Sequence, residues 1–224
     1  MSDDLRHVGA AVDRYLVEVL GTDDPDAQAA SSGGAAAGMP AIEVSSPHGR
    51  LLELLVAMSG ATRILEIGTL AGVSTIYLVR GAGPDGRVVT LELDERHAEV
   101  ARANFEHAGI GQQVEVRVGP AVASLDALLA EETPPFDFVF IDADKESNPI
   151  YLDRAVALSH PGTVIYVDNV VRDGKVAEEE STNPQIIGTR AMMELIASDD
   201  RLSATAIQTL GSKGYDGFLL ARVT

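Results

Sequence analysis

The sequence contains no cysteine. Disulfide bonds, thiolate zinc sites and cysteine nucleophiles are therefore excluded. It also lacks any apolar run near the ~18 residues that a membrane-spanning helix needs. Its first residues, MSDDLRHV, are acidic and mixed, unlike the basic and then apolar pattern of a secretory signal. We therefore expect a cytoplasmic protein that does not enter a membrane.

Basic residues are scarce. The chain has 17 lysines and arginines against 34 aspartates and glutamates, which gives a net charge of −17 at pH 7. Such a chain repels a phosphate backbone, and no basic stripe offsets the repulsion. Neither nucleic acid nor an anionic membrane surface is therefore expected as a partner. The excess of acid favours divalent cations, although most of it is expected to form a solvated surface.

The length and composition suit one domain over residues 1–224. A chain of 224 residues with 46% hydrophobic side chains can bury one good-sized core. The N-terminal part, residues 1–60, differs in pattern from the rest. We expect it to hold helices and a mobile loop, and residues 61–224 to form an α/β core.

Two helices are expected in the N-terminal part. Residues 4–20 place apolar side chains at roughly helical spacing, and residues 46–61 carry Pro47 in the first turn and Gly60 at the end. Residues 21–40 lie between them and consist largely of Gly, Ala, Ser and Asp. Because this segment has almost nothing to bury, we predict a mobile loop there.

From residue 62 onward, apolar runs alternate with helical patterns. The runs span residues 63–67, 87–93, 114–118, 136–141 and 162–167. Five strand–helix units of this size predict a parallel sheet with helices on both faces. Two further runs, 202–210 and 217–223, are separated by GSKGYD, which is too short for a crossover helix. They are expected to form an antiparallel hairpin, so the predicted fold is α/β with seven strands, the last one antiparallel.

Ligands of open parallel sheets bind at the carboxyl ends of the strands. The first strand ends in EIGTLAGVS, where Gly68 and Gly72 permit a tight turn and close approach of a ligand. Leu70 replaces the middle glycine of the dinucleotide fingerprint, so a pyrophosphate fits less well than a ligand without phosphates. Taken alone, this glycine pair favours a plain strand–helix turn.

Two acidic residues strengthen the case for a ligand. Glu92 ends the second strand at a spacing suited to binding ribose hydroxyls, while Asp94 is expected to cap the next helix. Glu66 lies at the tip of a buried strand, where a carboxylate needs a partner. The amino group of an amino-acid-like ligand is one candidate for that partner.

Acidic and amide side chains also follow two other apolar runs. FVFIDADK ends with Asp142 and Asp144, and VIYVDNV carries Asp168 and Asn169. If these strands are adjacent, ~4.8 Å apart, Asp142, Asp168 and Asn169 converge on one point. Such oxygen ligands suit Mg²⁺ or Ca²⁺, with Mn²⁺ also possible. Either tip alone would read as a solvated or helix-capping acid; together with the glycine turn and Glu92 they favour a cation site.

The motifs LEIGTLAGVSTIYL, LELD, VGPA, FIDADK and YVDNVV, in this order, resemble the cation-dependent O-methyltransferases that use S-adenosylmethionine. These are the caffeoyl-CoA and catechol O-methyltransferase-like enzymes, and the chain is similar to their bacterial branch. The resemblance extends from about residue 42 to the C-terminus. It implies a Rossmann-like class I methyltransferase fold, a homodimer and a small-molecule acceptor such as a catechol or another vicinal diol.

The resemblance also implies roles for single residues. Those expected to contact S-adenosylmethionine are Ile42, Val44, Glu66, Gly68, Ser74, Glu92, Ala121 and Asp142. The metal ligands would be Asp142, Asp168 and Asn169, and the catalytic residues Lys145 and Asp142. Lys145 would lie near the reacting hydroxyl, either as a general base or as a charged stabiliser of the oxyanion. The plain alternative for Lys145 is a surface lysine paired with Asp144 or Glu146.

The predicted activity is therefore methyl transfer to a hydroxyl group, assisted by a divalent cation. A cation bound to the acceptor stabilises its ionised oxygen and fixes its direction. Two alternatives stay open: a protein that binds S-adenosylmethionine without catalysis, and a nicotinamide-dependent oxidoreductase. The presence of the four residues Asp142, Lys145, Asp168 and Asn169 argues against the first, and Leu70 disfavours the second.

Overall fold

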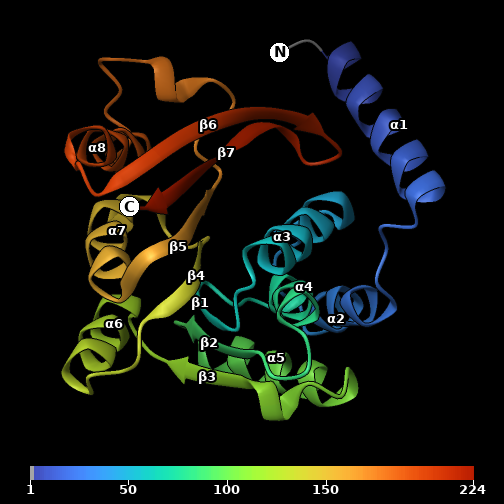
Figure 1. Cartoon of the computed structure of the whole chain (residues 1–224). Coiled ribbons are helices and arrows are strands. Elements are labelled where there is room, and N and C mark those ends of the chain that lie inside the picture. Colours follow the sequence, from blue (N-terminus) through green and yellow to red (C-terminus); the bar gives the residue numbers. More distant parts are fainter. Residues whose placement is uncertain (1–2) are drawn as a thin grey trace.

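A seven-stranded sheet forms the centre of the protein (Figure 1). The computed structural model describes residues 3–224, with side chains from residue 7 onward. The strands are β1 (Arg63–Ile67), β2 (Arg87–Glu92), β3 (Val114–Val118), β4 (Phe136–Ile141), β5 (Ser159–Asp168), β6 (Leu202–Gly211) and β7 (Gly214–Val223). They follow the order β3-β2-β1-β4-β5-β7-β6. Strands β1 to β5 are parallel, and β7 runs antiparallel to both β5 and β6.

This arrangement confirms the predicted fold class, including the C-terminal hairpin. The main difference lies in strand length. Strand β5 begins at Ser159 and β7 at Gly214, both three residues earlier than the apolar runs indicate. Few of the residues in these extensions are apolar. Backbone hydrogen bonds to neighbouring strands, rather than side-chain burial, hold them in strand conformation.

Helices cover both faces of the sheet (Figure 1). They are α1 (Asp3–Leu20), α2 (Pro25–Ala36), α3 (Ser46–Ser59), α4 (Val73–Ala82), α5 (Glu95–His107), α6 (Ala121–Ala130), α7 (Asn148–Ala157) and α8 (Pro184–Ser198), with short 3₁₀ turns at Gly111–Gln113, Lys145–Ser147 and Lys175–Ala177. Alternate residues of β1 point to opposite faces, so Leu65 packs with α6 to α8 and Ile64 with α2 to α5. Over the described residues, no helix is long and apolar enough to span a bilayer.

Helix ends follow the expected local chemistry. Gly60 terminates α3 in the left-handed conformation, with φ 68°, and its N–H donates to Ala57 and Val56 carbonyls. Asp94 caps α5, because its side chain accepts the N–H of Arg96. Both assignments confirm predictions from the sequence.

The loop prediction for residues 21–40 is wrong over Pro25–Ala36, which form helix α2. Asp24 starts the helix by accepting the N–H groups of Asp26 and Ala27. The small residues are what lets the helix dock. Ala30 is buried, and a Cβ at Gly34 would lie only 2.8 Å from the Cβ of Ala71. Helix α2 packs by close backbone approach, and a pattern of large apolar side chains therefore does not predict it.

This packing gives a stability prediction. Ala30→Leu should destabilise the protein by about 1–3 kcal/mol, because the larger side chain has no space between α2 and α5. Ala35 is exposed on the same helix, so Ala35→Leu is a matched control and should change stability by less than about 0.5 kcal/mol. Urea unfolding of both variants makes the comparison. Equal stabilities would mean that α2 does not pack as described.

Candidate active site

One large pocket lies at the carboxyl ends of the parallel strands. Its volume is about 1180 Å³. The ends of β1, β2, β4 and β5 form its floor, while residues 40–48 and the tip of the β6–β7 hairpin cover it. Sites for a single small ligand usually measure about 300–1,000 Å³, so this pocket has room for two ligands side by side.

The turn after β1 shapes one side of the floor. Gly68 and Gly72 both have positive φ, 104° and 85°. A Cβ at Gly68 would lie 2.1 Å from the carbonyl oxygen of Asp142, and a Cβ at Gly72 would lie 2.3 Å from the ring of Phe105. Only glycine fits at these two positions, which explains the G-x-x-x-G pattern.

Glu92 holds this turn in place. Its Oε2 accepts the N–H of Leu70 at 2.8 Å and that of Thr69 at 3.3 Å, and its Oε1 accepts the N–H of Asp94 at 3.0 Å. Leu70 has φ 51°, which is unfavourable for leucine and needs such support. A carboxylate offers about four acceptor positions, so Glu92 retains capacity for a ligand hydroxyl in the pocket that it lines.

Glu66 lies beneath the turn rather than in the pocket lining. Its carboxylate accepts three hydroxyl hydrogen bonds, from Ser74 at 2.6 Å, Thr75 at 2.5 Å and Thr90 at 2.7 Å. Complete burial raises the pKa of Glu66 to about 7, although the three hydrogen bonds oppose this shift. The structure thus supplies partners from the protein itself, where the sequence suggested a ligand amino group. Glu66 is linked to the pocket lining through Ser74 and, by way of Thr90, through Thr69.

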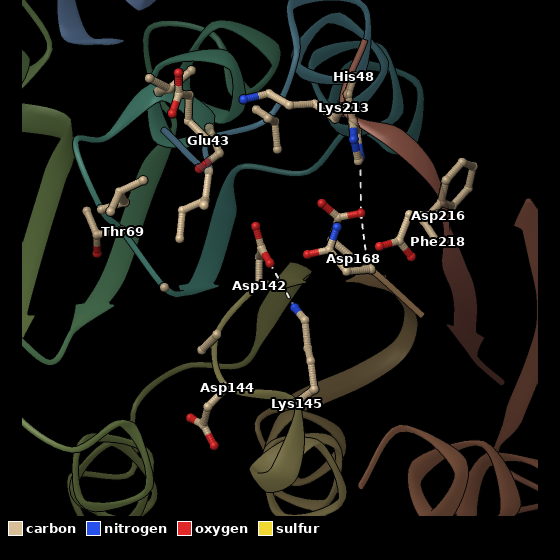
Figure 2. A pocket seen from close by; sticks show the side chains of 18 of the residues that line it. Glu43, His48, Thr69, Asp142, Asp144, Lys145, Asp168, Lys213, Asp216 and Phe218 are labelled. Atoms are coloured by element: carbon tan, nitrogen blue, oxygen red, sulfur yellow. Dashed lines mark hydrogen bonds and ion pairs between the residues drawn. The ribbon is translucent and has the colours of Figure 1, made fainter. Parts of the chain in front are cut away.

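The register of β4 and β5 brings two carboxylates together. Ile141 pairs with Val167, so the following residues, Asp142 and Asp168, leave the sheet side by side. Figure 2 shows their side chains facing the same space, with Lys145 on one side. Lys145 Nζ donates to Asp142 Oδ1 at 2.8 Å, and its side chain is 4% exposed. The partner of Lys145 is therefore Asp142 rather than Asp144 or Glu146.

Asp168 is a buried carboxylate with little compensation from the protein. Burial raises its pKa above the usual aspartate range, and the nearby Asp142 carboxylate adds to the shift, while Lys145 opposes it. His48 Nε2 lies 3.8 Å from Asp168 Oδ1, but burial lowers the pKa of His48 and favours its neutral form. Asn169 follows Asp168 and lines the same pocket. Two carboxylates and an amide with so little positive charge fit a divalent cation.

Three or more His, Asp or Glu side chains grouped as a metal site are not found in residues 3–224. The predicted set includes only two such side chains, because its third member is the amide of Asn169. The fit to a cation therefore rests on donor chemistry and charge. It does not rest on a preformed cage of carboxylates.

Several pocket residues were not predicted from the sequence, and His48 and Asp216 are the ones nearest to Asp168 in its electrostatic environment. His48 donates to or accepts from the hydroxyl of Tyr166 at 2.5 Å and reaches over Asp168 (Figure 2). Asp216, on β7, lines the pocket and raises the pKa of Asp168 through its charge. Antiparallel pairing sets Phe218 opposite Asp168, which places Asp216 just beyond the end of β5. The register between β5 and β7 was the only signal that could have identified Asp216 as a pocket residue.

The pocket brings together nearly all the predicted site residues. Those that line it are Ile42, Val44, Gly68, Ser74, Glu92, Ala121, Asp142, Lys145, Asp168 and Asn169. Glu66 is the exception. Asp144, which ends the same motif as Asp142, is engaged instead with the hydroxyl of Tyr151 at 2.5 Å.

Comparison with known proteins identifies the family. The O-methyltransferase family model matches residues 31–223. Catechol O-methyltransferases of Mycobacterium tuberculosis and Niastella koreensis are 50% and 46% identical, and each alignment covers 95% of this chain and 94% or 96% of the relative. An O-methyltransferase from Bacillus cereus in complex with SAH (S-adenosylhomocysteine) has a TM-score of 0.95 at 51% identity, covering 97% of this chain and 99% of that one. The chain therefore belongs to the O-methyltransferase family, which confirms the family and the class of enzyme that the sequence motifs indicated.

The burial of Glu66 predicts a pH-dependent stability. Its folded pKa of about 7 exceeds the ordinary value of 4.5, so its contribution is full below pH 4.5 and is lost as pH rises through 7. The contribution of Glu66 to the free energy of unfolding should therefore fall by about 3 kcal/mol between pH 4.5 and 8. Glu66→Gln cannot ionise and should lack this loss. Urea unfolding at several pH values measures both profiles.

A matched control is Glu99→Gln, because Glu99 is exposed on α5. Its stability profile should follow that of the wild type. Parallel profiles for wild type and Glu66→Gln would show that Glu66 does not titrate in this range.

Proposed function

We propose that this protein transfers a methyl group from S-adenosylmethionine to a hydroxyl of a catechol-like or other vicinal-diol small molecule, and that a divalent cation assists the transfer. The observation that carries the proposal is the pairing of Asp142 and Asp168 at the floor of a pocket with room for two ligands. The catechol O-methyltransferase relatives support the acceptor class.

The methyl donor would occupy the side of the pocket formed by β1 and β2. Glu92 would bind the ribose hydroxyls, and Gly68 and Ser74 would adjoin the amino-acid part. Ala121 lies on the same side and would border the adenine. The pocket turn has Leu70 where a dinucleotide needs glycine, which agrees with a donor that lacks a pyrophosphate. The SAH-bound Bacillus cereus relative supports this choice of ligand.

Asp142, Asp168 and Asn169 would hold the cation, for which Mg²⁺ is our first choice and Ca²⁺ or Mn²⁺ are alternatives. When bound, such a cation supplies Lewis-acid stabilisation of an ionised hydroxyl oxygen. The chain itself supplies orientation. Neighbouring strand ends fix the positions of the two carboxylates. The acceptor beside them would therefore be oriented toward the donor for an in-line displacement at the methyl carbon.

Lys145 would act on the acceptor oxygen. Its ammonium group is fixed by Asp142 at 2.8 Å and is almost fully buried, so it keeps a defined position in the pocket. We propose that the ammonium group of this ion pair stabilises the negative charge that develops on the attacking oxygen. A role as general base would require Lys145 to lose its proton first.

The alternatives are less well supported. Membership of the O-methyltransferase family argues against a nicotinamide-dependent oxidoreductase. A protein that binds S-adenosylmethionine without catalysis has no need of the buried Lys145 paired with Asp142 beside the buried Asp168, and burying charged groups is costly.

We also propose a homodimer. Helix α1 exposes large apolar side chains on its surface, at Val8, Val12, Tyr15 and Val19. Apolar side chains gathered on one element are typical of protein–protein contacts. Sedimentation velocity of the wild type and of Val12→Glu provides the test: the wild type should sediment as a dimer and the variant as a smaller species.

The metal-assisted mechanism is tested at Asp168. Asp168→Asn keeps the volume of the side chain but removes one carboxylate, so kcat/KM with catechol should fall by on the order of 100-fold or more. Calorimetry should show that S-adenosylmethionine still binds within a few-fold of wild-type affinity. Methylation by the wild type should cease in EDTA and return with Mg²⁺.

Asp85→Asn is the control, because Asp85 is exposed in a turn far from the pocket lining. It should retain full activity. Turnover that persists undiminished in EDTA would disprove the role of the cation while leaving methyl transfer intact.

A further inference from the structure

The tip of the β6–β7 hairpin is fixed over the mouth of the pocket. Asp13 on α1 accepts the N–H of Ser212 at 2.6 Å. Gly9 on the same helix lets α1 approach the hairpin, since a Cβ there would lie 3.1 Å from Leu210. The next residue in the turn, Lys213, lines the pocket, and its Nζ donates to the carbonyl oxygen of Ala41 at 3.3 Å. Lys213 is exposed, and contacts with α1 and with Ala41 position the turn and its side chain at the pocket.

A second cationic side chain, that of Arg172, lines the same pocket. Arg172 lies in the turn after β5 and has φ 56°. Asp216 stabilises this turn, because its Oδ1 accepts the N–H groups of Val171 at 3.0 Å and Arg172 at 2.9 Å. The Arg172 side chain donates to Gln185 Oε1 at 2.5 Å, which uses one of its five donors.

The acids around this part of the pocket already have partners. Asp216 accepts three backbone N–H groups in all, Glu43 accepts the hydroxyl of Ser31, and Asp144 accepts the hydroxyl of Tyr151. By contrast, neither Lys213 nor Arg172 has a carboxylate within ion-pair distance among the residues whose side chains are described.

Figure 2 shows Lys213 on the far side of the pocket from Lys145, with Asp142 and Asp168 between them. A ligand whose hydroxyls lie at Asp168 would therefore extend its other end toward Lys213. In a chain of net charge −17, Lys213 at that end and Arg172 in the same pocket, both without carboxylate partners among the described side chains, favour a negatively charged group on the ligand.

We propose that the acceptor is a catechol that carries a carboxylate remote from its hydroxyls, and that Lys213, together with Arg172, binds this carboxylate. The inference rests on the proposed function and specifies its substrate class. Lys213 and Arg172 are specificity determinants, because they contact the end of the acceptor that does not react.

The test compares three acceptors with the same ring and hydroxyls: 3,4-dihydroxybenzoate, 3,4-dihydroxybenzyl alcohol and 3,4-dihydroxybenzylamine. Wild-type kcat/KM, measured with Mg²⁺, should be highest for the acid and lowest for the amine. Lys213→Met should lower kcat/KM for the acid by about fivefold, as expected for a partly exposed ion pair, while the value for the alcohol changes by less than about twofold. Arg172→Met should act in the same direction, and Lys213→Arg should retain the preference for the acid.

Lys175→Met is the matched control, because Lys175 is exposed and does not line the pocket. It should leave the values for all three acceptors unchanged. A wild type that methylates the three acceptors equally well, or a Lys213→Met variant that lowers all three equally, would overturn this inference while the proposed function stands. Absence of methylation of every acceptor would overturn both.

Discussion

The parallel pairing of β4 with β5 is the constraint on which the site depends. Its register sets Ile141 beside Val167, so Asp142 and Asp168 must emerge next to each other from the sheet. Two adjacent carboxylates repel each other, and the burial of Asp168 increases the free-energy cost of keeping both ionised. The large hydrophobic clusters on both faces of the sheet hold the strands together against this repulsion. The core therefore maintains a local concentration of negative charge that a cation would relieve.

The acids at the strand ends are stabilised in four different ways. Glu66 is surrounded by hydroxyl groups, Glu92 by backbone N–H groups, and Asp142 by the ammonium group of Lys145. Asp168 accepts the N–H of Asn169, lies farther from His48, and is stabilised at a distance by the charge of Lys145. Because each carboxylate has a different environment, the site can separate structural roles from ligand binding. Glu66 is purely internal, Glu92 both secures the turn and lines the pocket, and Asp142 and Asp168 face the pocket.

Much of the fold could be predicted because buried parallel strands are nearly continuous apolar runs. RILEI and FVFI needed no knowledge of the rest of the chain. Helix α2 could not be predicted in this way, since its stability comes from small side chains that fit against α4 and α5 rather than from large apolar ones. The strand-end residues could also be predicted from the sequence, because motifs that follow parallel strands lie at one edge of the sheet.

The residues that were missed lie where tertiary contacts decide. His48 and Asp216 enter the pocket from α3 and β7, and no local pattern marks either one. Their positions follow from how the helix and the hairpin pack on the sheet. Glu66 was recognised as an unusual acid, but its three hydroxyl partners come from α4 and β2 and depend on the packing of those elements.

The contact between Asp13 and the backbone of Ser212 joins the two ends of the chain above the pocket. The floor of the pocket belongs to the central strands, whereas its cover is built from residues 40–48 and the β6–β7 hairpin, which contribute neither Asp142 nor Asp168. Sequence change in the cover can therefore alter which molecules enter without disturbing the machinery below. An enzyme built in this way can diversify its choice of acceptor by exchanging its outer segments, while the reaction that it performs is inherited unchanged.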